Sequence, residues 1–422
     1  MSGEPGTAVR RRRMFYIPGY DPIHPRRYRE LYRKEGAAQA GISGYALTLS
    51  PAPPEAERYG WQVDAQIDGV EVHTDVEVLV WADIVRDSMS LSIPGTYLQM
   101  LRTAWTYIST GTLWRLMRLR KGPVIAAFYP IAMLLGQLLL ALLAAALLVL
   151  VLDCGMRHLL PAAWTGAALV MALLTGAAWA AGVVLMVAIL RWFKRRDGKL
   201  FAYYLLHDYA HNSALRGAYA PEMETRLASF GDAIAGALTD EVDEVLVVGH
   251  SSGAHLGTSV LADLIRAGRV PQDGPALGFL SLGQVVPMVA FLPDAQRLRA
   301  DLAYLCTRDE LAWVDVTAPG DGCAFALCDP VAVSVVPPPG KRWPLVFSAA
   351  FTQSLSPERW KALRWRFFRL HFQYLCAFDR PKDYDYFQIT AGPQTLAHRY
   401  AGRAPSRSRI ARTISRHTSV AP

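Results

Sequence analysis

Two long uncharged apolar segments constrain what this chain can fold into more than any other feature of its sequence. Residues 123–152 and residues 162–190 contain no charged side chain. Each segment exceeds the roughly 20 apolar residues that an α-helix needs to cross the hydrocarbon core of a bilayer. Helices of this length and polarity are rare inside a soluble domain. The sequence therefore predicts two transmembrane helices, at residues 123–152 and 162–190.

The charges around these segments predict a hairpin and its orientation. Only residues 153–161 join the two segments, and Arg157 is the one lysine or arginine in this link. Residues 115–121 contain four lysines and arginines, and residues 191–199 contain five. The positive-inside rule then predicts that both flanks, and the domain they carry, are cytoplasmic. We predict an integral protein of a bacterial-type inner membrane, with the lipid bilayer as its partner.

The formal net charge of +8 fits the same location. Arginines cluster at both ends of the chain and beside the apolar segments, and anionic lipid headgroups explain this charge most simply. No nucleic-acid-reading motif accompanies the charge, so we expect no nucleic acid partner. The five cysteines include no C-x-x-C pair, which argues against a disulfide framework or a structural zinc site. We expect no metal and no other cofactor.

Outside the apolar segments, strand-like and helix-like segments alternate. Residues 61–81 alternate in the β manner around Asp68-Gly69, as expected of a β-hairpin. Residues 244–248 form the continuous apolar run of a buried parallel strand. The other predicted strands are residues 14–17, 44–50, 278–289, 302–307 and 312–317. This pattern predicts an α/β fold with a mostly parallel sheet flanked by helices, into which the transmembrane hairpin is inserted.

Residues 249–253 read Gly-His-Ser-Ser-Gly and match the pattern G-x-S-x-G. The pattern alone is weak, but a buried strand ends directly before it and an apolar-periodic helix begins directly after it. A nucleophile elbow requires this strand–turn–helix context, because the turn exposes the serine oxygen above the sheet. The sequence therefore predicts Ser251 as a catalytic nucleophile.

Through this motif and its strand–turn–helix context, the chain resembles an α/β-hydrolase of the esterase/lipase kind. The resemblance covers roughly residues 14–50 and 220–395. The resemblance implies a triad in the order nucleophile, acid, histidine. The acid is expected in the turn after the strand at residues 312–317, where Asp321 is the first choice. Asp329, in a Cys-Asp-Pro-Val run, is the alternative, and Asp315 lies inside the strand, where a structural role is expected.

The resemblance also implies a histidine after the acid and two backbone N–H donors for an oxyanion. His371 begins an aromatic segment where the family often places this residue, and His398 is the alternative. Ser252 is expected to supply one donor, since it follows the nucleophile. The other donor, Tyr20 or Gly19, is expected from the loop after the first strand. This chain has Pro18-Gly19 where the family often has His-Gly.

The resemblance implies a serine hydrolase that cleaves a carboxylic ester through an acyl-enzyme. The membrane hairpin suggests a lipid or other amphiphilic acyl ester as its substrate. Two alternatives stay open: a non-catalytic membrane scaffold on a hydrolase fold, and an acyltransferase.

The predicted organisation has six parts. They are a disordered basic N-terminus (1–13), the first part of the hydrolase domain (14–89), an interfacial approach segment (90–122), the transmembrane hairpin (123–190), the main part of the hydrolase domain (199–400) and a disordered basic tail (401–422).

Overall fold

The computed structural model describes residues 8–161, 164 and 167–421. These residues fall into two compact units. The larger unit contains the chain up to residue 88, residues 106–124 and the chain from residue 212 onward. The smaller unit contains residues 89–105 and 125–211. Residues 199–211, predicted as part of the hydrolase domain, therefore belong to the smaller unit.

Across the described residues, eight strands form one sheet in the order β2-β3-β4-β1-β5-β6-β7-β8. The strand β3 is antiparallel to β2 and β4, and every other neighbouring pair is parallel. This confirms the predicted mostly parallel α/β sheet. The strands are β1 (Arg11–Ile17), β2 (Ala46–Pro51), β3 (Gly60–Ile67), β4 (Val70–Val78), β5 (Glu244–His250), β6 (Ala276–Leu282), β7 (Ala312–Thr317) and β8 (Leu345–Ser348).

The predicted β-hairpin is present. Asp68 and Gly69 join β3 to β4, and both have positive φ values, 52° and 76°. A two-residue turn with positive φ at both positions matches the right-handed twist of the two strands that it joins.

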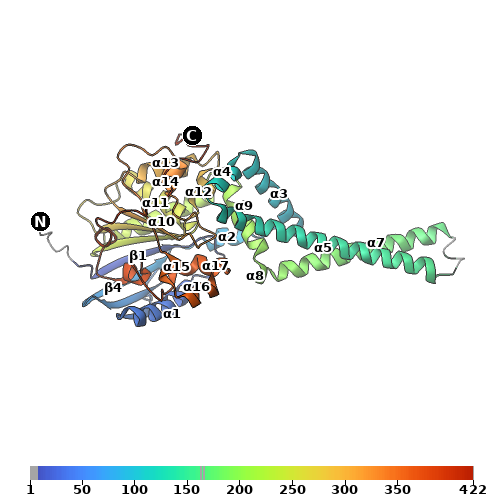
Figure 1. Cartoon of the computed structure of the whole chain (residues 1–422), viewed down its shortest axis with the longest axis horizontal. Coiled ribbons are helices and arrows are strands. Elements are labelled where there is room, and N and C mark those ends of the chain that lie inside the picture. Colours follow the sequence, from blue (N-terminus) through green and yellow to red (C-terminus); the bar gives the residue numbers. More distant parts are fainter. Residues whose placement is uncertain (1–7, 162–163, 165–166, 422) are drawn as a thin grey trace. The chain divides into compact units, whose positions relative to one another are not determined.

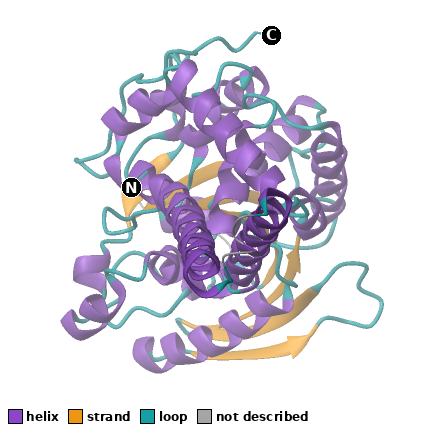
Figure 2. Cartoon of the chain, turned by 90° about the vertical axis from the view of Figure 1, so that its right-hand side faces the viewer, coloured by secondary structure: helices purple, strands orange, loops and turns teal. Residues whose placement is uncertain are grey.

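Helices cover both faces of the sheet, because the central strands are apolar on both faces. Figure 2 shows the strands between helices, and in Figure 1 α10, α11, α13 and α14 lie on one side of the sheet and α1 on the other. The helices of the larger unit are α1 (Arg26–Ser43), α2 (Ala82–Ser88), α4 (Thr112–Leu119), α10 (Pro221–Ala237), α11 (Gly253–Arg266), α12 (Val286–Ala290), α13 (Gln296–Leu305), α14 (Pro330–Ser334), α15 (Phe351–Ser354), α16 (Pro357–Leu363), α17 (Phe367–His371), the 3₁₀ helix η1 (Phe372–Leu375), α18 (Tyr386–Ala391) and α19 (Leu396–Arg399).

The sheet changes its direction of growth between β1 and β5. Strands β4, β3 and β2 extend it on one side of β1, and β6, β7 and β8 extend it on the other side of β5. In open parallel sheets, the carboxyl ends of the strands form a crevice at such a switch point, where ligands bind. Here β1 ends at Ile17 and β5 ends at His250, so the residues that follow them meet at this crevice.

The N-terminal prediction needs a correction. Residues 11–13 were predicted to be disordered, but they are the first residues of β1. Arg12 is buried there and forms an ion pair with Glu244 of β5, with 2.6 Å between Nε and Oε2. An arginine cluster indicates disorder only while its charges stay solvated, and here the carboxylate of a neighbouring strand neutralises one of them.

The C-terminal prediction is also wrong. Residues 401–421 were predicted to be disordered, but their backbone bonds to the larger unit. Ile410 N–H donates to Leu327 O at 2.7 Å, and Ile414 N–H donates to Val333 O at 3.1 Å. Side-chain composition, rich in Ser and Arg, does not reveal backbone hydrogen bonds of this kind.

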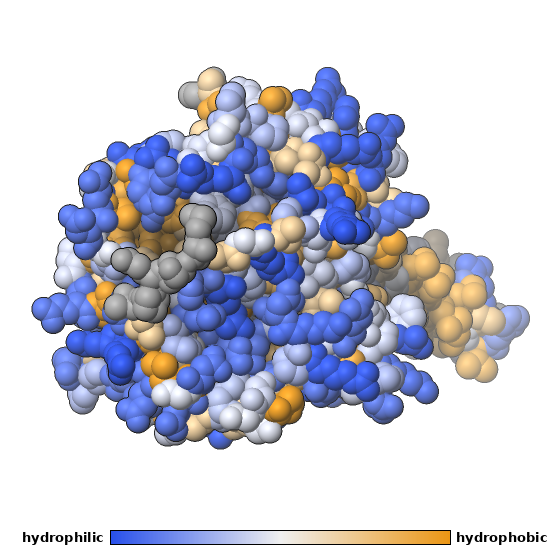
Figure 3. Space-filling model, turned by 60° about the vertical axis from the view of Figure 1, so that its left-hand side comes forward, coloured by the Kyte–Doolittle hydropathy of each residue, from blue (hydrophilic) through white to orange (hydrophobic). Residues whose placement is uncertain are grey.

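The smaller unit is built on two long helices, α5 (Lys121–Leu159) and α7 (Ala168–Arg195), with α8 (Asp197–Leu200) and α9 (Ala202–Ser213) after them. Among the described residues, α5 and α7 are the helices long and apolar enough to cross a membrane. Their leucines are largely exposed, with Leu150 at 65% and Leu169 at 73%. Figure 3 shows mainly hydrophobic residues at the visible end of this pair, whereas the visible face of the larger unit is mainly hydrophilic.

The ends of these helices differ from the predicted bounds. The first helix continues through the predicted link to Leu159, because residues 153–159 offer no helix-breaking proline and pair Asp153 with Arg157 at i,i+4. The predicted start of the second helix, at residues 162–166, lies largely outside the described residues.

The predicted approach segment, residues 90–122, is only partly exposed. It forms α3 (Ile93–Ser109) and α4, and its second half packs in the larger unit. Tyr107 Oη donates to Met288 O at 3.0 Å, and Thr112 Oγ1 donates to Phe291 O at 3.1 Å. Large exposed apolar side chains remain in this segment on α3, with Trp105 at 71%, and on α4, with Trp114 at 61%.

Candidate active site

Ser251 occupies the sharp turn between β5 and α11. Its φ is 56°, a left-handed conformation that is strained for a residue with a side chain and that recurs at functional sites. Its N–H donates to Leu282 O at 2.9 Å, which continues the pairing of β5 with β6. Gly253 permits the turn, because a Cβ at that position would lie 2.0 Å from Ile17 O. The side chain of Ser251 is half-buried and therefore reachable.

The loop after β1 lies over this turn. A Cβ on Gly19 would come within 2.9 Å of Ser251 Cβ and 3.4 Å of Ser251 Oγ. Trp81 holds the loop in place, since its Nε1–H donates to Pro18 O at 3.0 Å. Tyr20 is buried, with its hydroxyl 2.6 Å from Ser88 Oγ. The structure thus places the predicted loop at the predicted serine.

The two predicted oxyanion donors come from these two segments. Ser252 directly precedes the first residue of α11, where backbone N–H groups have no partner within the helix. Tyr20 lies one residue beyond Gly19 in the loop that covers Ser251. The structure therefore brings Gly19 and Ser252 to the Ser251 turn, with Tyr20 next to Gly19 in the chain.

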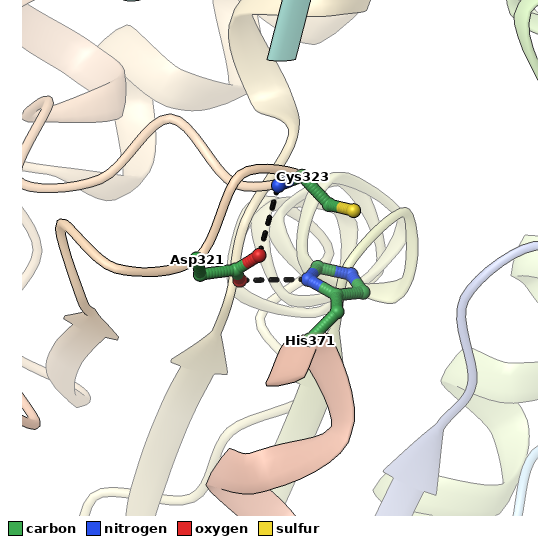
Figure 4. A group of neighbouring side chains, drawn as sticks. All are labelled: Asp321, Cys323 and His371. Atoms are coloured by element: carbon green, nitrogen blue, oxygen red, sulfur yellow. Dashed lines mark hydrogen bonds and ion pairs between the residues drawn. The ribbon is translucent and has the colours of Figure 1, made fainter. Parts of the chain in front are cut away.

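Asp321 and His371 form a buried hydrogen-bonded pair (Figure 4). His371 Nδ1 lies 2.7 Å from Asp321 Oδ2, and the exposed fractions of their side chains are 8% and 0%. Asp321 follows β7, and His371 is the last residue of α17. With the Nδ1 proton donated to the carboxylate, Nε2 of His371 carries the free lone pair.

The Asp321 carboxylate is held by further donors. Cys323 N–H donates to Oδ1 at 2.9 Å, and Tyr374 Oη donates to Oδ2 at 3.0 Å. Burial would raise the pKa of Asp321, but the charge of His371 and the hydrogen bonds from His371, Cys323 and Tyr374 outweigh burial and lower this pKa. Asp321 is therefore an ionised partner for His371.

Ser251 and His371 are brought together through shared neighbours. His250 precedes Ser251 in the chain, and its Nε2–H donates to His371 O at 3.0 Å. Burial and, to a smaller extent, the charge of His371 lower the pKa of His250 to about 3, so its ring is neutral. A Cβ on Gly283 would lie 3.1 Å from His371 Cε1, and the preceding Leu282 accepts the Ser251 N–H. Both residues are described, and the structure contains no hydrogen bond between Ser251 Oγ and the His371 ring. Such bonds are often formed only with substrate bound.

The alternative acids have other partners. Asp329 caps α14, accepting from Val331 N–H and Ala332 N–H, and forms an ion pair with Lys341 at 2.7 Å. Asp315 lies within β7 and accepts from Ser281 Oγ at 2.6 Å. Neither carboxylate is bonded to a histidine among the described residues.

The alternative histidine has no carboxylate bonded to its ring in the described structure. His398 lies in α19 and lines a surface hollow with Asp243 and Asp273, at the amino ends of β5 and β6. That end of the sheet is opposite to the one that carries Ser251.

Three positioning residues were missed by the sequence analysis: Trp81, Tyr374 and Gly283. Tyr374 belongs to the aromatic segment on which the prediction of His371 was based. The sequence of that segment does not show which group the Tyr374 hydroxyl contacts. Trp81 ends the alternating segment 61–81, where a tryptophan is equally expected of an ordinary core.

Comparisons of the chain with models of known protein families, with curated proteins and with solved structures find no match.

Proposed function

We propose that this chain is a membrane-anchored serine hydrolase of the α/β-hydrolase type, which cleaves a carboxylic ester through an acyl-enzyme on Ser251. One observation carries the proposal: Ser251, held at φ 56° at the sheet's switch point, shares its surroundings with a buried Asp321–His371 pair. Nucleophile, base and base-orienting acid are the three roles that such chemistry requires.

The chemistry follows from the free Nε2 of His371. Ser251 Oγ attacks the carbonyl carbon of the ester and gives its proton to Nε2. The carbonyl oxygen becomes an oxyanion, which the N–H groups of Ser252 and of Tyr20 or Gly19 stabilise. When the oxyanion collapses, the bond to the leaving alcohol breaks and that alcohol takes the proton from His371. A water molecule then attacks the acyl-enzyme, passes a proton through His371 and releases the carboxylic acid and Ser251.

The membrane anchor is the part of the proposal that α5 and α7 support. At 1.5 Å per residue, a helix of 39 residues spans about 58 Å, well beyond the roughly 30 Å of a bilayer core. Exposed leucines along both helices favour lipid over water around them. The basic flanks favour a cytoplasmic location for the larger unit.

One face of α3 adds a surface suited to the lipid interface. Leu98, Leu101, Trp105 and Ile108 recur at helical spacing and are exposed, with Trp105 at 71%. The opposite face of α3, which includes Met100, is buried. An apolar stripe that contains tryptophan, next to basic residues, is typical of a helix lying in the interface. Substrates that partition into the cytoplasmic leaflet, namely lipid or other amphiphilic acyl esters, suit an enzyme tethered in this way.

The deciding experiment uses a fluorophosphonate probe, which reacts with an activated serine. Membranes containing the full-length chain should be labelled, and Ser251→Ala should abolish labelling. His371→Ala should abolish it as well, whereas His398→Ala, a matched histidine at the other end of the sheet, should keep it. If none of the folded proteins is labelled, the proposal fails and the scaffold alternative replaces it.

The substrate class needs a separate assay. Purified protein in vesicles of diacyl phospholipid should release fatty acid, and vesicles of the matching ether-linked lipid should yield none. Cleavage confined to small water-soluble esters would contradict the lipid substrate while leaving the serine chemistry intact. Adding an acceptor alcohol and measuring the transfer product separates hydrolysis from acyl transfer.

A further inference from the structure

The proposed active site contains a thiol that the ester chemistry does not use. Asp321, Cys323 and His371 each present a ligand atom, and these atoms all lie within 4.8 Å of one another. Figure 4 shows the Cys323 and His371 side chains next to each other, with the Asp321 carboxylate bonded to both residues. Cys323 is not in a disulfide and is only partly buried, so an ion can reach the group from solvent.

The ligand atoms select the kind of metal. A thiolate, an imidazole and a carboxylate together suit Zn²⁺, whereas Mg²⁺ and Ca²⁺ prefer oxygen ligands only. Bonds of 2.0–2.3 Å to a tetrahedral zinc ion place its ligand atoms about 3.3–3.8 Å apart. Rotation of the partly exposed Cys323 side chain adjusts the position of its Sγ. Where Nδ1 of His371 is the ligand, it must also separate from Asp321 Oδ2, because these two atoms are 2.7 Å apart in the metal-free pair. A fourth position would stay open for water.

The residues around the group already orient its ligands. Tyr374 Oη donates to Asp321 Oδ2 at 3.0 Å, and its own oxygen accepts from Ala318 N–H at 2.9 Å. His250 fixes the backbone of His371 through its carbonyl oxygen. Metal ligands are held by such outer hydrogen bonds, and a site that already has them loses less freedom when the metal binds.

We propose that Asp321, Cys323 and His371 bind Zn²⁺, and that the bound ion reversibly inhibits the serine hydrolase. The second half of this inference rests on the proposed function. A zinc ion on either ring nitrogen of His371 stops its catalytic role, because the ring then cannot both accept the Ser251 proton and donate to Asp321. Binding releases the thiol proton to water, and where Nδ1 is the ligand the ring proton moves to Nε2. Removal of zinc returns a proton from water to the thiol and restores the Nδ1–H tautomer.

The binding test uses the full-length protein in detergent micelles, with Zn²⁺ supplied from a metal buffer and measured by equilibrium dialysis. We expect one tightly bound zinc ion per chain and no comparable binding of Mg²⁺. Cys323→Ala should weaken zinc binding by about 100-fold or more, since loss of an outer-shell partner alone costs 10–100-fold. Cys376→Ala is the matched control, because Cys376 is also partly buried and not in a disulfide but lies outside the group. Equal zinc affinity in Cys323→Ala and the wild-type protein would overturn the site.

The inhibition test compares each protein with itself, with and without zinc, by the rate of fluorophosphonate labelling. Zinc should slow labelling of the wild-type protein and of Cys376→Ala at least tenfold, and a chelator should restore it, whereas Cys323→Ala should change less than twofold. Zinc inhibition that persists in Cys323→Ala would refute the inference. If the hydrolase proposal itself fails, the wild-type protein is not labelled even in the absence of zinc. The dialysis experiment then still tests whether the metal site exists.

Discussion

Gly19 lies against Ser251 so closely that there is no room for a side chain at residue 19. A Cβ at that position would come within 2.9 Å of Ser251 Cβ and 3.3 Å of His250 O. We expect Gly19→Ala to slow fluorophosphonate labelling of Ser251 about 100-fold, because displacing a reacting group by about 1 Å has an effect of this size. The measurement is the labelling rate of the folded full-length protein.

Gly41→Ala is the control for this change. Gly41 lies inside α1, and a Cβ there would meet no atom within 4 Å. Alanine should stabilise that helix by about 0.5–1 kcal/mol and leave labelling unchanged. Equal labelling rates in Gly19→Ala and Gly41→Ala would remove the loop after β1 from the site.

Asp321→Asn tests the choice of acid. The asparagine amide does not keep the His371 ring in the tautomer with Nδ1–H, as the carboxylate does. We therefore expect the rates of labelling and ester hydrolysis to fall by a factor on the order of 10⁴. Asp329→Asn is the matched substitution at the alternative acid. Because an asparagine still caps α14, its labelling rate should stay within a few-fold of the wild-type rate. A larger loss in Asp329→Asn than in Asp321→Asn would reverse the assignment.

Asp315 predicts a specific pH dependence of stability. Burial, partly offset by the Ser281 hydrogen bond, raises the pKa of this carboxyl to about 8. Its Oδ2 has no hydrogen-bond partner among the described residues, as expected of a protonated carboxyl. Between pH 3.9, near the unfolded pKa, and pH 8, the folded chain holds a proton that the unfolded chain has lost. The free energy of unfolding therefore falls as pH rises through this window.

Asp315→Asn removes this proton uptake and keeps the shape of the side chain. We expect its melting temperature to exceed that of the wild-type protein at pH 8, on the order of 5 °C, and to approach it at pH 4. Thermal unfolding in detergent at both pH values measures the difference. A constant difference between the two pH values would show that Asp315 is ionised in the folded protein.

Local patterns predicted the part of the site that depends on neighbours in sequence. The turn at Ser251 needed only an apolar strand, two glycines and an apolar helix, and all of these lie between residues 244 and 266. Strand β7 also has the predicted bounds, residues 312–317. Residues 302–307 were wrongly predicted as a strand: residues 302–305 end α13, and residues 306–307 form the turn after it. A short buried apolar run has the same composition in either element.

Long-range pairing could not be predicted in this way. Asp321 and His371 are joined across 50 positions, and only the order implied by the family resemblance pointed to them. The pairing of β1 with both β4 and β5, which brings Gly19 to Ser251, depends on a crossover that no local pattern records. The C-terminal tail was missed for a related reason, since its contacts are made by backbone groups.

The orientation in the membrane can be tested with a cysteine that the chain already has. Cys154 is exposed near the end of α5, next to Asp153, and the basic flanks predict that this end lies outside the cytoplasm. A membrane-impermeant maleimide should therefore label the chain in spheroplasts, and Cys154→Ser should abolish this labelling. Cys323, in the larger unit, should become reactive only after the membrane is permeabilised, which also checks that the spheroplasts are intact. Labelling of Cys154 only after permeabilisation would reverse the predicted topology and place the larger unit outside the cytoplasm.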